Sequence, residues 1–212
     1  MLFKTGDRIL FIGDSITDSD RREDHDERLG WGYVRMIRDY YQASYPNTRM
    51  NIVNHGIGGD RVTDLQSRWQ EDVIKHSPDY VSISIGINDV WRQLDSPEMK
   101  QVYPDQFKEV YTELLKIVKE KTSAQIILME PTIIEEDIEA KGNLLLKEYV
   151  QVIHDLAKQF EAIIVPTHQA FITYLKADSK VSITTDGVHM NSIGNLLMAK
   201  TWIESCHEAQ RK

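Results

Sequence analysis

The sequence predicts an α/β fold, a three-layer α/β/α sandwich in which helices cover both faces of a five-stranded parallel sheet. Five short apolar segments alternate with longer segments that repeat apolar residues at helical spacing. Strands this short and this apolar are typical of parallel sheets that are buried on both faces. The alternation also predicts right-handed crossovers and a ligand site beyond the carboxyl ends of the strands.

The strands are expected where the chain is most continuously apolar. In chain order they are residues 9–12, 50–54, 80–85, 125–129 and 162–165. No Pro-, Gly- or Ser-rich linker and no internal repeat interrupts this series. Residues 1–212 are therefore expected to form a single domain, which is long enough to bury one core.

Helices are expected where apolar residues recur at i, i+3, i+4 and i+7. This spacing occurs over residues 62–73, 107–118 and 146–160, and a further helix is expected to begin after residue 32. The last predicted helix carries the stripe Leu196, Ala199, Ile203 and Cys206. Such stripes are far more often the core-facing sides of helices than parts of a cofactor site.

Charge and cysteine content exclude several classes of partner and compartment. The 212 residues carry a formal charge of -8 without a stripe of Lys or Arg, which argues against nucleic acid and anionic membranes as partners. The single cysteine, Cys206, has no partner for an internal disulfide and is expected to be partly buried. No secretory leader and no apolar run of about 20 residues is present, so a cytoplasmic protein is expected.

Four polar or glycine-rich clusters follow the predicted strands or precede the last helix. They are Gly13-Asp14-Ser15, residues 54–60, Gly86-Ile87-Asn88-Asp89 and Asp186-Gly187-Val188-His189. Because the carboxyl ends of parallel strands meet at one edge of the sheet, the clusters are expected to converge there.

Ser15 is either an ordinary helix cap or a nucleophile at the end of the first strand. Serine is among the commonest N-cap residues, so the cap is the simpler interpretation of this position alone. The pair Asp186 and His189 changes the balance. A carboxylate three residues from a histidine in a turn can accept a hydrogen bond from Nδ1 and leave Nε2 as a base. Among the other histidines, only His55, beside the glycines of the second cluster, is a serious rival.

Attack by a serine also requires donors for the developing oxyanion. Gly58 and Gly59 could present backbone N–H groups, because glycine lets the chain turn them outward. Asn88 could add an amide donor, although a helix cap is the simpler role for it. Together with Ser15, Asp186 and His189, these residues supply every part of an acyl-transfer site.

The four clusters, in this order, resemble the sequence blocks of the SGNH (GDSL-type) hydrolase family across nearly the whole chain. The resemblance implies a flavodoxin-like α/β/α fold and a serine ester hydrolase that needs no metal or cofactor. It implies Ser15 as nucleophile, His189 as general base and acid, and Asp186 as the carboxylate that orients His189. The oxyanion hole would comprise the N–H groups of Ser15 and Gly59 and the side chain of Asn88.

In the same resemblance, Asp14 and Asp89 support the geometry of the loops. The stretches GINDVWRQ (residues 86–93) and RWQEDVI (residues 68–74) are similar to bacterial acetylxylan esterases and related carbohydrate acetyl esterases. This similarity implies O-acetyl groups on a carbohydrate, such as xylo-oligosaccharides, as substrates. Related esterases are often oligomeric, so a homo-oligomer is compatible with it.

The polar segment 18–32 is interpreted as a solvated loop, or as a rim that shapes access of the substrate. A rim with few apolar residues suits a sugar better than a long acyl chain. Trp31 and Trp91 would stack on sugar rings or fill the core, and Arg92 is a further candidate for substrate contact.

Three alternatives stay open beside this interpretation. A nucleotide-binding module is suggested by Gly56-Ile57-Gly58 after a strand, but Arg61 stands where a dinucleotide fingerprint needs its third glycine. A metal hydrolase would use residues 24–27 as ligands, although adjacent positions in a charged loop seldom converge on one ion. Within the esterases, a lysophospholipase or thioesterase is the alternative.

Overall fold

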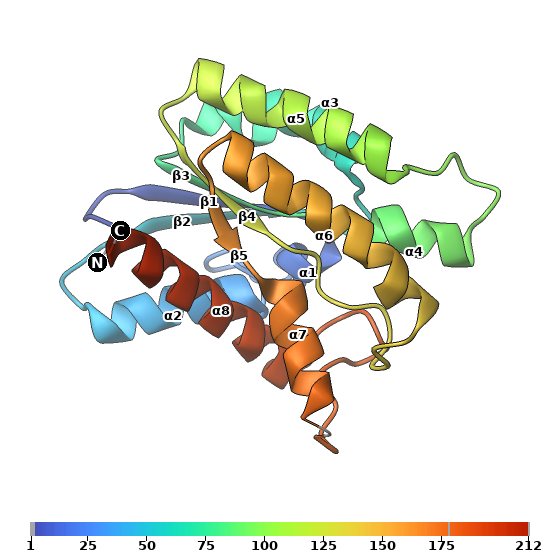
Figure 1. Ribbon diagram of the computed structural model, residues 1–212. Helices are drawn as coiled ribbons and strands as arrows, with labels where there is room; N and C mark the ends of the chain where they lie inside the picture. Colours follow the sequence, from blue (N-terminus) through green and yellow to red (C-terminus); the bar gives the residue numbers. More distant parts are fainter. Residues whose placement is uncertain (1–2, 178, 212) are drawn as a thin grey trace.

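The computed structural model describes residues 3–177 and 179–211, and its architecture is the predicted α/β/α sandwich (Figure 1). The strands are β1 Arg8–Gly13, β2 Asn51–Gly56, β3 Tyr80–Ser84, β4 Gln125–Met129 and β5 Ile163–Val165. The helices are α1 Ser15–Asp18, α2 Tyr33–Ser44, α3 Val62–Asp72, α4 Ile87–Asp95, α5 Pro104–Lys121, α6 Lys141–Gln159, α7 Thr167–Lys176 and α8 Ser192–Arg211, and a 3₁₀ turn, η1, spans Ile74–His76.

All five strands are parallel, in the order β2-β1-β3-β4-β5. From β1 the chain first adds β2 on one side and then returns to add β3, β4 and β5 on the other. The carboxyl ends of β1 and β3 therefore flank the point where the order reverses, which is where doubly wound sheets bind their ligands. The clusters that contain Ser15 and Asn88 follow these two strands directly.

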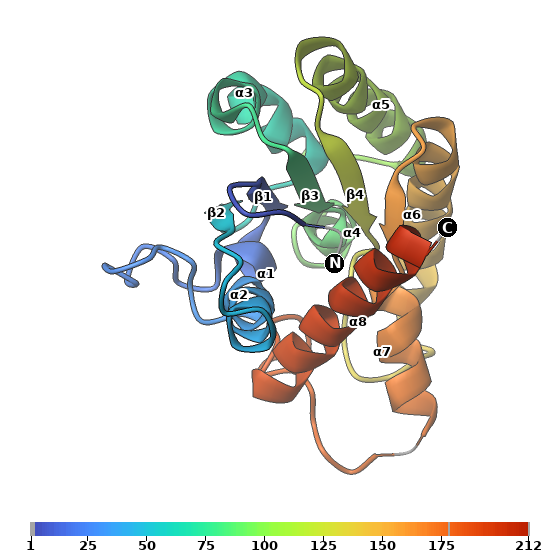
Figure 2. The ribbon, with the colours of Figure 1, turned by 90° about the vertical axis from the view of Figure 1, so that its left-hand side faces the viewer.

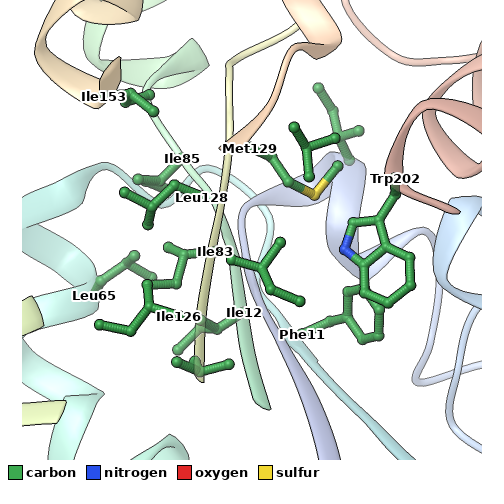
Figure 3. Close-up of a cluster of buried hydrophobic side chains, with 14 of the residues drawn as sticks. Phe11, Ile12, Leu65, Ile83, Ile85, Ile126, Leu128, Met129, Ile153 and Trp202 are labelled. Atoms are coloured by element: carbon green, nitrogen blue, oxygen red, sulfur yellow. The ribbon is translucent and has the colours of Figure 1, made fainter. Parts of the chain in front are cut away.

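Helices cover both faces of the sheet (Figures 1 and 2). Helices α3, α5 and α6 pack side by side on one face, and α2 and α8 pack on the other, with α7 against α8. The close-up in Figure 3 shows how the alternation of side chains along a strand fills both layers. Phe11 packs on Trp202 of α8, with ring centroids 5.4 Å apart, while Ile12 points to the other face, toward Leu65.

Several boundaries differ from the sequence-based prediction. β2 continues through Gly56, two residues further than expected, because Gly13 and Gly56 still pair in register. The polar side chain of Asn54 can stay buried in this longer strand because it is hydrogen-bonded. Its Nδ2 donates to the carbonyl oxygens of Thr17 and Leu29 at 2.7 and 2.8 Å. β3 ends at Ser84 rather than 85, and β5 begins at Ile163 rather than 162.

On α8, the expected core stripe is partly wrong. Ala199, Ile203 and Cys206 are buried, but Leu196 is 59% exposed. Cys206 is fully rather than partly buried, and burial raises the pKa of its thiol. Along the described ranges 3–177 and 179–211, no helix combines the length and the apolar character needed to cross a membrane.

Candidate active site

Ser15 lies at the first position of α1, immediately after β1. The N-cap of this helix is Asp14, whose Oδ1 accepts a hydrogen bond from the N–H of Ile16 at 3.0 Å. Asp14 therefore fills the capping role that the sequence alone also offered to Ser15, and the hydroxyl of Ser15 is free for another partner. Gly13 permits the tight approach of β3, because a Cβ there would lie 2.2 Å from the carbonyl oxygen of Ser84.

The partner of Ser15 comes from the turn before α8. Ser15 Oγ lies 2.9 Å from His189 Nε2, and His189 Nδ1 lies 2.7 Å from Asp186 Oδ2. The structure thus brings Ser15 together with Asp186 and His189, although Ser15 and His189 are 174 positions apart in the sequence. Each distance is a hydrogen-bond distance, and the order of contacts is hydroxyl, imidazole, carboxylate.

Asp186 is anchored by more than the imidazole. Its Oδ1 accepts hydrogen bonds from the backbone N–H groups of Val188 at 3.0 Å and His189 at 2.7 Å. Burial opposes ionisation of this carboxyl, but the N–H groups and the ring of His189 outweigh burial and lower its pKa to about 2. Asp186 is therefore a stable carboxylate that holds the imidazole in one orientation.

The loop after β4 supports this turn. The N–H of Glu135 donates to the carbonyl oxygen of Gly187 at 2.7 Å. Oε1 of Glu136 accepts from the hydroxyl of Ser182 at 2.6 Å and from the N–H groups of Ile183 and Thr184 at 3.0 and 2.7 Å. Sequence reasoning missed Glu136, because a single glutamate in a polar loop carries no motif and its contacts lie more than 40 positions away.

The glycine and asparagine clusters meet on the other side of Ser15. Asn88 is the second residue of α4 rather than its cap, and its Nδ2 donates to the carbonyl oxygen of Asp60 at 3.0 Å. Gly59, next to Asp60, has φ +85°, and a Cβ there would meet nothing within 4 Å, so its backbone borders open space. Gly58 is closer to the serine, since a Cβ there would lie 3.9 Å from Ser15 Cβ.

Asp14 and Asp89 are buried carboxyls that fix the first turns of helices. Asp14 caps α1, and both carboxylate oxygens of Asp89 accept from the N–H of Val62 at the start of α3, at 3.2 and 3.3 Å. Burial raises the pKa of Asp14 to about 7 and that of Asp89 to about 8, although these N–H groups act in the opposite direction. Both side chains shape the loops around Ser15.

The buried carboxyl of Asp89 contributes to the pH dependence of stability, and Asp89→Asn is expected to remove that contribution while the contribution of Asp14 stays. Folded Asp89 keeps its proton up to about pH 8, whereas the ordinary pKa is 3.8, so the folded state binds the extra proton between these values. Stability from this group is therefore lost as pH rises through that range, by up to about 1.4 kcal/mol per pH unit. Urea unfolding of both proteins across the range measures the effect, and parallel stability curves would contradict it.

His55, the rival histidine, lies in a different cluster. Its Nδ1 is 3.6 Å from Asp72 Oδ1, and its ring packs on His76 with centroids 4.5 Å apart. Burial lowers its pKa to about 4, against the opposing charge of Asp72. Within residues 3–177 and 179–211, Ser15 has His189 as its imidazole partner, and His55 makes no hydrogen bond or ring contact with it.

A cavity of about 370 Å³ opens beside Ser15 and His189. Its other walls are mainly polar and include Asp18, Ser19, Asp20, Thr185 and Asn195, with Ile16 and Met190 as the apolar residues. Ser19 and Asp20 both adopt positive φ, 41° and 59°, which non-glycine residues rarely do. Backbone strain of this kind is frequent at ligand sites.

The predicted substrate contacts are distributed around this region. Trp91 is half-buried, with its ring centroid 6.0 Å from that of His189, and the guanidinium of Arg92 lies 5.0 Å from the centroid of Trp91. Trp31 is 58% exposed, so it does not fill the core, and Arg35 lies 4.6 Å from its centroid. The N–H of Trp31 donates to the carbonyl oxygen of Ser19, a residue of the cavity wall, at 2.8 Å.

The segment 18–32 is organised around the buried carboxylate of Asp24. This group accepts from the N–H of Leu29 at 2.8 Å and pairs with Arg35 at 2.5 Å, while Glu27 pairs with Arg35 and Arg38. Two of the carboxylates that a metal hydrolase would use as ligands here, Asp24 and Glu27, are thus engaged by N–H groups and arginines. The segment is therefore more than a solvated loop, because Asp24 hydrogen-bonds backbone N–H groups of the same segment and pairs with Arg35.

Comparisons with known proteins agree with this geometry. Residues 11–197 match the GDSL-like Lipase/Acylhydrolase family. An acetylxylan esterase from Geobacillus stearothermophilus is 38% identical over 209 residues, which cover 96% of this chain and 95% of that protein. The crystal structure of Axe2, an acetylxylan esterase from that organism, has a TM-score of 0.90 at 37% identity and covers 97% of this chain and 96% of the other.

Related solved structures extend the comparison. Three are catalytic mutants of Axe2 in which an aspartate, a serine or a histidine is replaced by alanine. LAE5, an alpha/beta hydrolase enzyme from the metagenome of Lake Arreo, Spain, has a TM-score of 0.91 at 32% identity, over 98% of both chains. These matches confirm the predicted fold and enzyme class, and they favour an enzyme over a nucleotide-binding module. The chain belongs to the GDSL-like lipase/acylhydrolase family and is a carboxylic ester hydrolase.

Proposed function

We propose that the protein is a serine esterase that removes acetyl groups from a carbohydrate, such as an acetylated xylo-oligosaccharide, through an acyl-enzyme. One observation carries the catalytic part of the proposal. Ser15 Oγ, His189 Nε2, His189 Nδ1 and Asp186 Oδ2 form a continuous chain of contacts of 2.9 and 2.7 Å at the edge of a mainly polar cavity. The catalytic mutants of Axe2, which replace the same three residue types, support it.

In the proposed reaction, His189 Nε2 takes the proton of Ser15 Oγ as the oxygen attacks the carbonyl carbon of the ester. The tetrahedral intermediate collapses, the C–O bond to the sugar breaks, and His189 returns the proton to the leaving hydroxyl. Water then attacks the acetyl-serine with His189 as base, which releases acetate and regenerates Ser15. Asp186 stays ionised throughout and stabilises the charged imidazole.

The oxyanion is assigned to the N–H groups of Ser15 and Gly59 and to the side chain of Asn88. The N–H of Ser15 belongs to the first residue of α1, where a helix leaves its N–H groups unused. The N–H of Gly59 has no acceptor among the described residues, and Gly59 borders open space. Nδ2 of Asn88 donates one hydrogen to Asp60 and retains a second for the substrate.

The substrate class rests on the cavity and on the relatives. Among the described residues, only two apolar side chains, Ile16 and Met190, line the cavity of about 370 Å³, which is a poor lining for a long acyl chain. Exposed Trp31 would provide a face for a sugar ring, and Trp91 and Arg92 would contact the substrate near His189. The name of the relative with 38% identity, an acetylxylan esterase, supports acetyl groups on a xylan-type carbohydrate.

Hydrolysis of p-nitrophenyl esters from acetate to decanoate tests the acyl preference. We expect kcat/KM to be highest for acetate and to fall by at least about tenfold by octanoate, because the polar walls do not reward additional methylenes. Release of acetate from acetylated xylo-oligosaccharides then tests the alcohol. Preference for long chains would instead support a lysophospholipase or thioesterase.

A further inference from the structure

The guanidinium of Arg68, on α3, joins three segments that surround Ser15. Nη2 donates to the carbonyl oxygen of Gly13 at the end of β1, at 3.0 Å, and Nη1 donates to that of His55 in β2, at 2.8 Å. Nε donates to the carboxylate of Asp60 at 2.7 Å. Arg68 therefore links the end of β1 to the loop that contains Gly59.

The same contacts reach both sides of the proposed oxyanion hole. Gly13 precedes the Asp14-Ser15 pair by one residue, so its carbonyl fixes the entry to α1. Asp60 directly follows Gly59, and the carbonyl oxygen of Asp60 accepts the amide of Asn88 at 3.0 Å. Displacement of Asp60 would therefore move the backbone of Gly59 and release Asn88.

Few other contacts hold the segment 57–60. Within it, the N–H of Asp60 donates to the carbonyl oxygen of Ile57 at 3.3 Å, and the N–H of Ile57 donates to Gly13 at 3.0 Å. Gly59 itself has open space around the position of a Cβ. The ion pair between Asp60 and Arg68 is largely shielded, with side-chain exposures of 12% and 13%. Such a pair constrains the loop more strongly than a surface pair would.

We propose that Arg68 is a positioning residue, which holds the Gly59 N–H and the Asn88 amide at the distance from Ser15 that the oxyanion requires. The inference rests on the oxyanion hole assigned under the proposed function. The planar guanidinium addresses two carbonyl oxygens and two carboxylates, those of Asp60 and of Asp72 at 2.7 Å, which a lysine ammonium on a flexible stem cannot do in the same geometry. Misplacement of catalytic donors by about 1 Å costs on the order of 10²-fold in rate.

Arg68→Met is the first test, with p-nitrophenyl acetate as substrate. We expect kcat to fall by roughly 10–100-fold while KM stays within about threefold, because donors that act in the transition state are displaced and ground-state contacts are kept. Arg68→Lys should recover part of the loss, since it keeps the charge opposite Asp60. Lys75→Met is the matched control. Lys75 lies just after α3, and its substitution removes a cation from an exposed ion pair with Glu71.

A double-mutant cycle separates positioning from general damage to the fold. Asn88→Ala alone is expected to cost about 10²–10³-fold in kcat. In the Arg68→Met background the additional loss should be at least about fivefold smaller, because the amide is already misplaced. Titration of active sites with paraoxon gives the fraction of competent enzyme. Destabilised protein would lower this fraction and leave the effect of Asn88→Ala unchanged, which would overturn the proposal.

Further outcomes decide the proposal when Arg68→Met does not fold. Asp60→Asn keeps an acceptor for Nε and removes the charge, so kcat should fall by several-fold, about 3–10, with KM unchanged. Values of kcat within about twofold of wild type in Asp60→Asn, or in folded Arg68→Met, would overturn the positioning role. Activity that survives Ser15→Ala would instead overturn the proposed function. An inactive Ser15→Ala beside an unaffected Arg68→Met would refute this inference alone.

Discussion

Ser15→Ala is expected to lower kcat by a factor on the order of 10⁶, the loss that follows removal of a serine nucleophile from a triad. The hydroxyl lies 2.9 Å from His189 Nε2, and alanine leaves no atom there to form the acyl-enzyme. Water attack assisted by the oxyanion donors would leave a small residual rate. The fold should persist, because Asp14 rather than Ser15 caps α1. Initial rates with p-nitrophenyl acetate and a thermal melt measure the two effects.

The matched control for this variant is Ser67→Ala, an exposed serine on α3 whose hydroxyl donates to the carbonyl oxygen of Asp64. It should retain full activity. A fluorophosphonate probe should label wild-type protein on the peptide that contains Ser15 and leave Ser15→Ala unlabelled. Substantial esterase activity in Ser15→Ala, with labelling elsewhere, would show that another residue is the nucleophile.

Asp186→Asn is expected to lower kcat by roughly 10³–10⁴-fold with a small change in KM. The carboxylate accepts the Nδ1–H of His189 at 2.7 Å and so leaves the lone pair of Nε2 toward Ser15. The amide of an asparagine at position 186 can donate to Nδ1 of His189, which favours the tautomer that carries its proton on Nε2. Because the pKa of Asp186 is about 2, the carboxylate is ionised across the range in which the enzyme is assayed, and its protonation should not appear in the pH–rate profile.

Steady-state kinetics of Asp186→Asn from mildly acidic to alkaline pH test this expectation. Asp137→Asn serves as the control, because Asp137 is an exposed residue of the neighbouring loop whose carboxylate accepts the N–H of Glu139. A loss of less than about tenfold in Asp186→Asn would mean that the carboxylate does not fix the tautomer. An acid limb that vanishes in Asp186→Asn would assign that limb to the aspartate.

Much of the fold could be predicted because its signals are local. The apolar segments that became β1, β3 and β4 and the stripes that became α3, α5 and α6 are properties of single segments, set by the spacing of side chains along a strand or helix. Leu196 shows the limit of this reasoning. Its spacing fits the predicted stripe, yet it is 59% exposed, because the buried face of α8 is centred on Asn195, Met198 and Trp202 and Leu196 lies beside that face.

Two short helices, α1 and α4, were not predicted. The four residues of α1 contain too few apolar positions to show a period, whereas α4 does carry one, at Ile87, Val90, Trp91 and Leu94, so that signal was overlooked. Both helices nevertheless carry residues of the site, Ser15 and Asn88. Their placement follows from the switch point between β1 and β3, which is a property of the whole sheet.

The sequence by itself determined the fold class and family of this protein, together with the residue types gathered at the sheet edge. These are encoded in order and spacing along the chain. Only the tertiary structure decided that Asp14 is the cap, that Trp31 is exposed, and that His55 pairs with Asp72 rather than with Ser15. It alone showed the contacts of Arg68 and Glu136, because these are hydrogen bonds to backbone groups far away in sequence. Such contacts depend on which segments the fold brings together, and no local pattern records them.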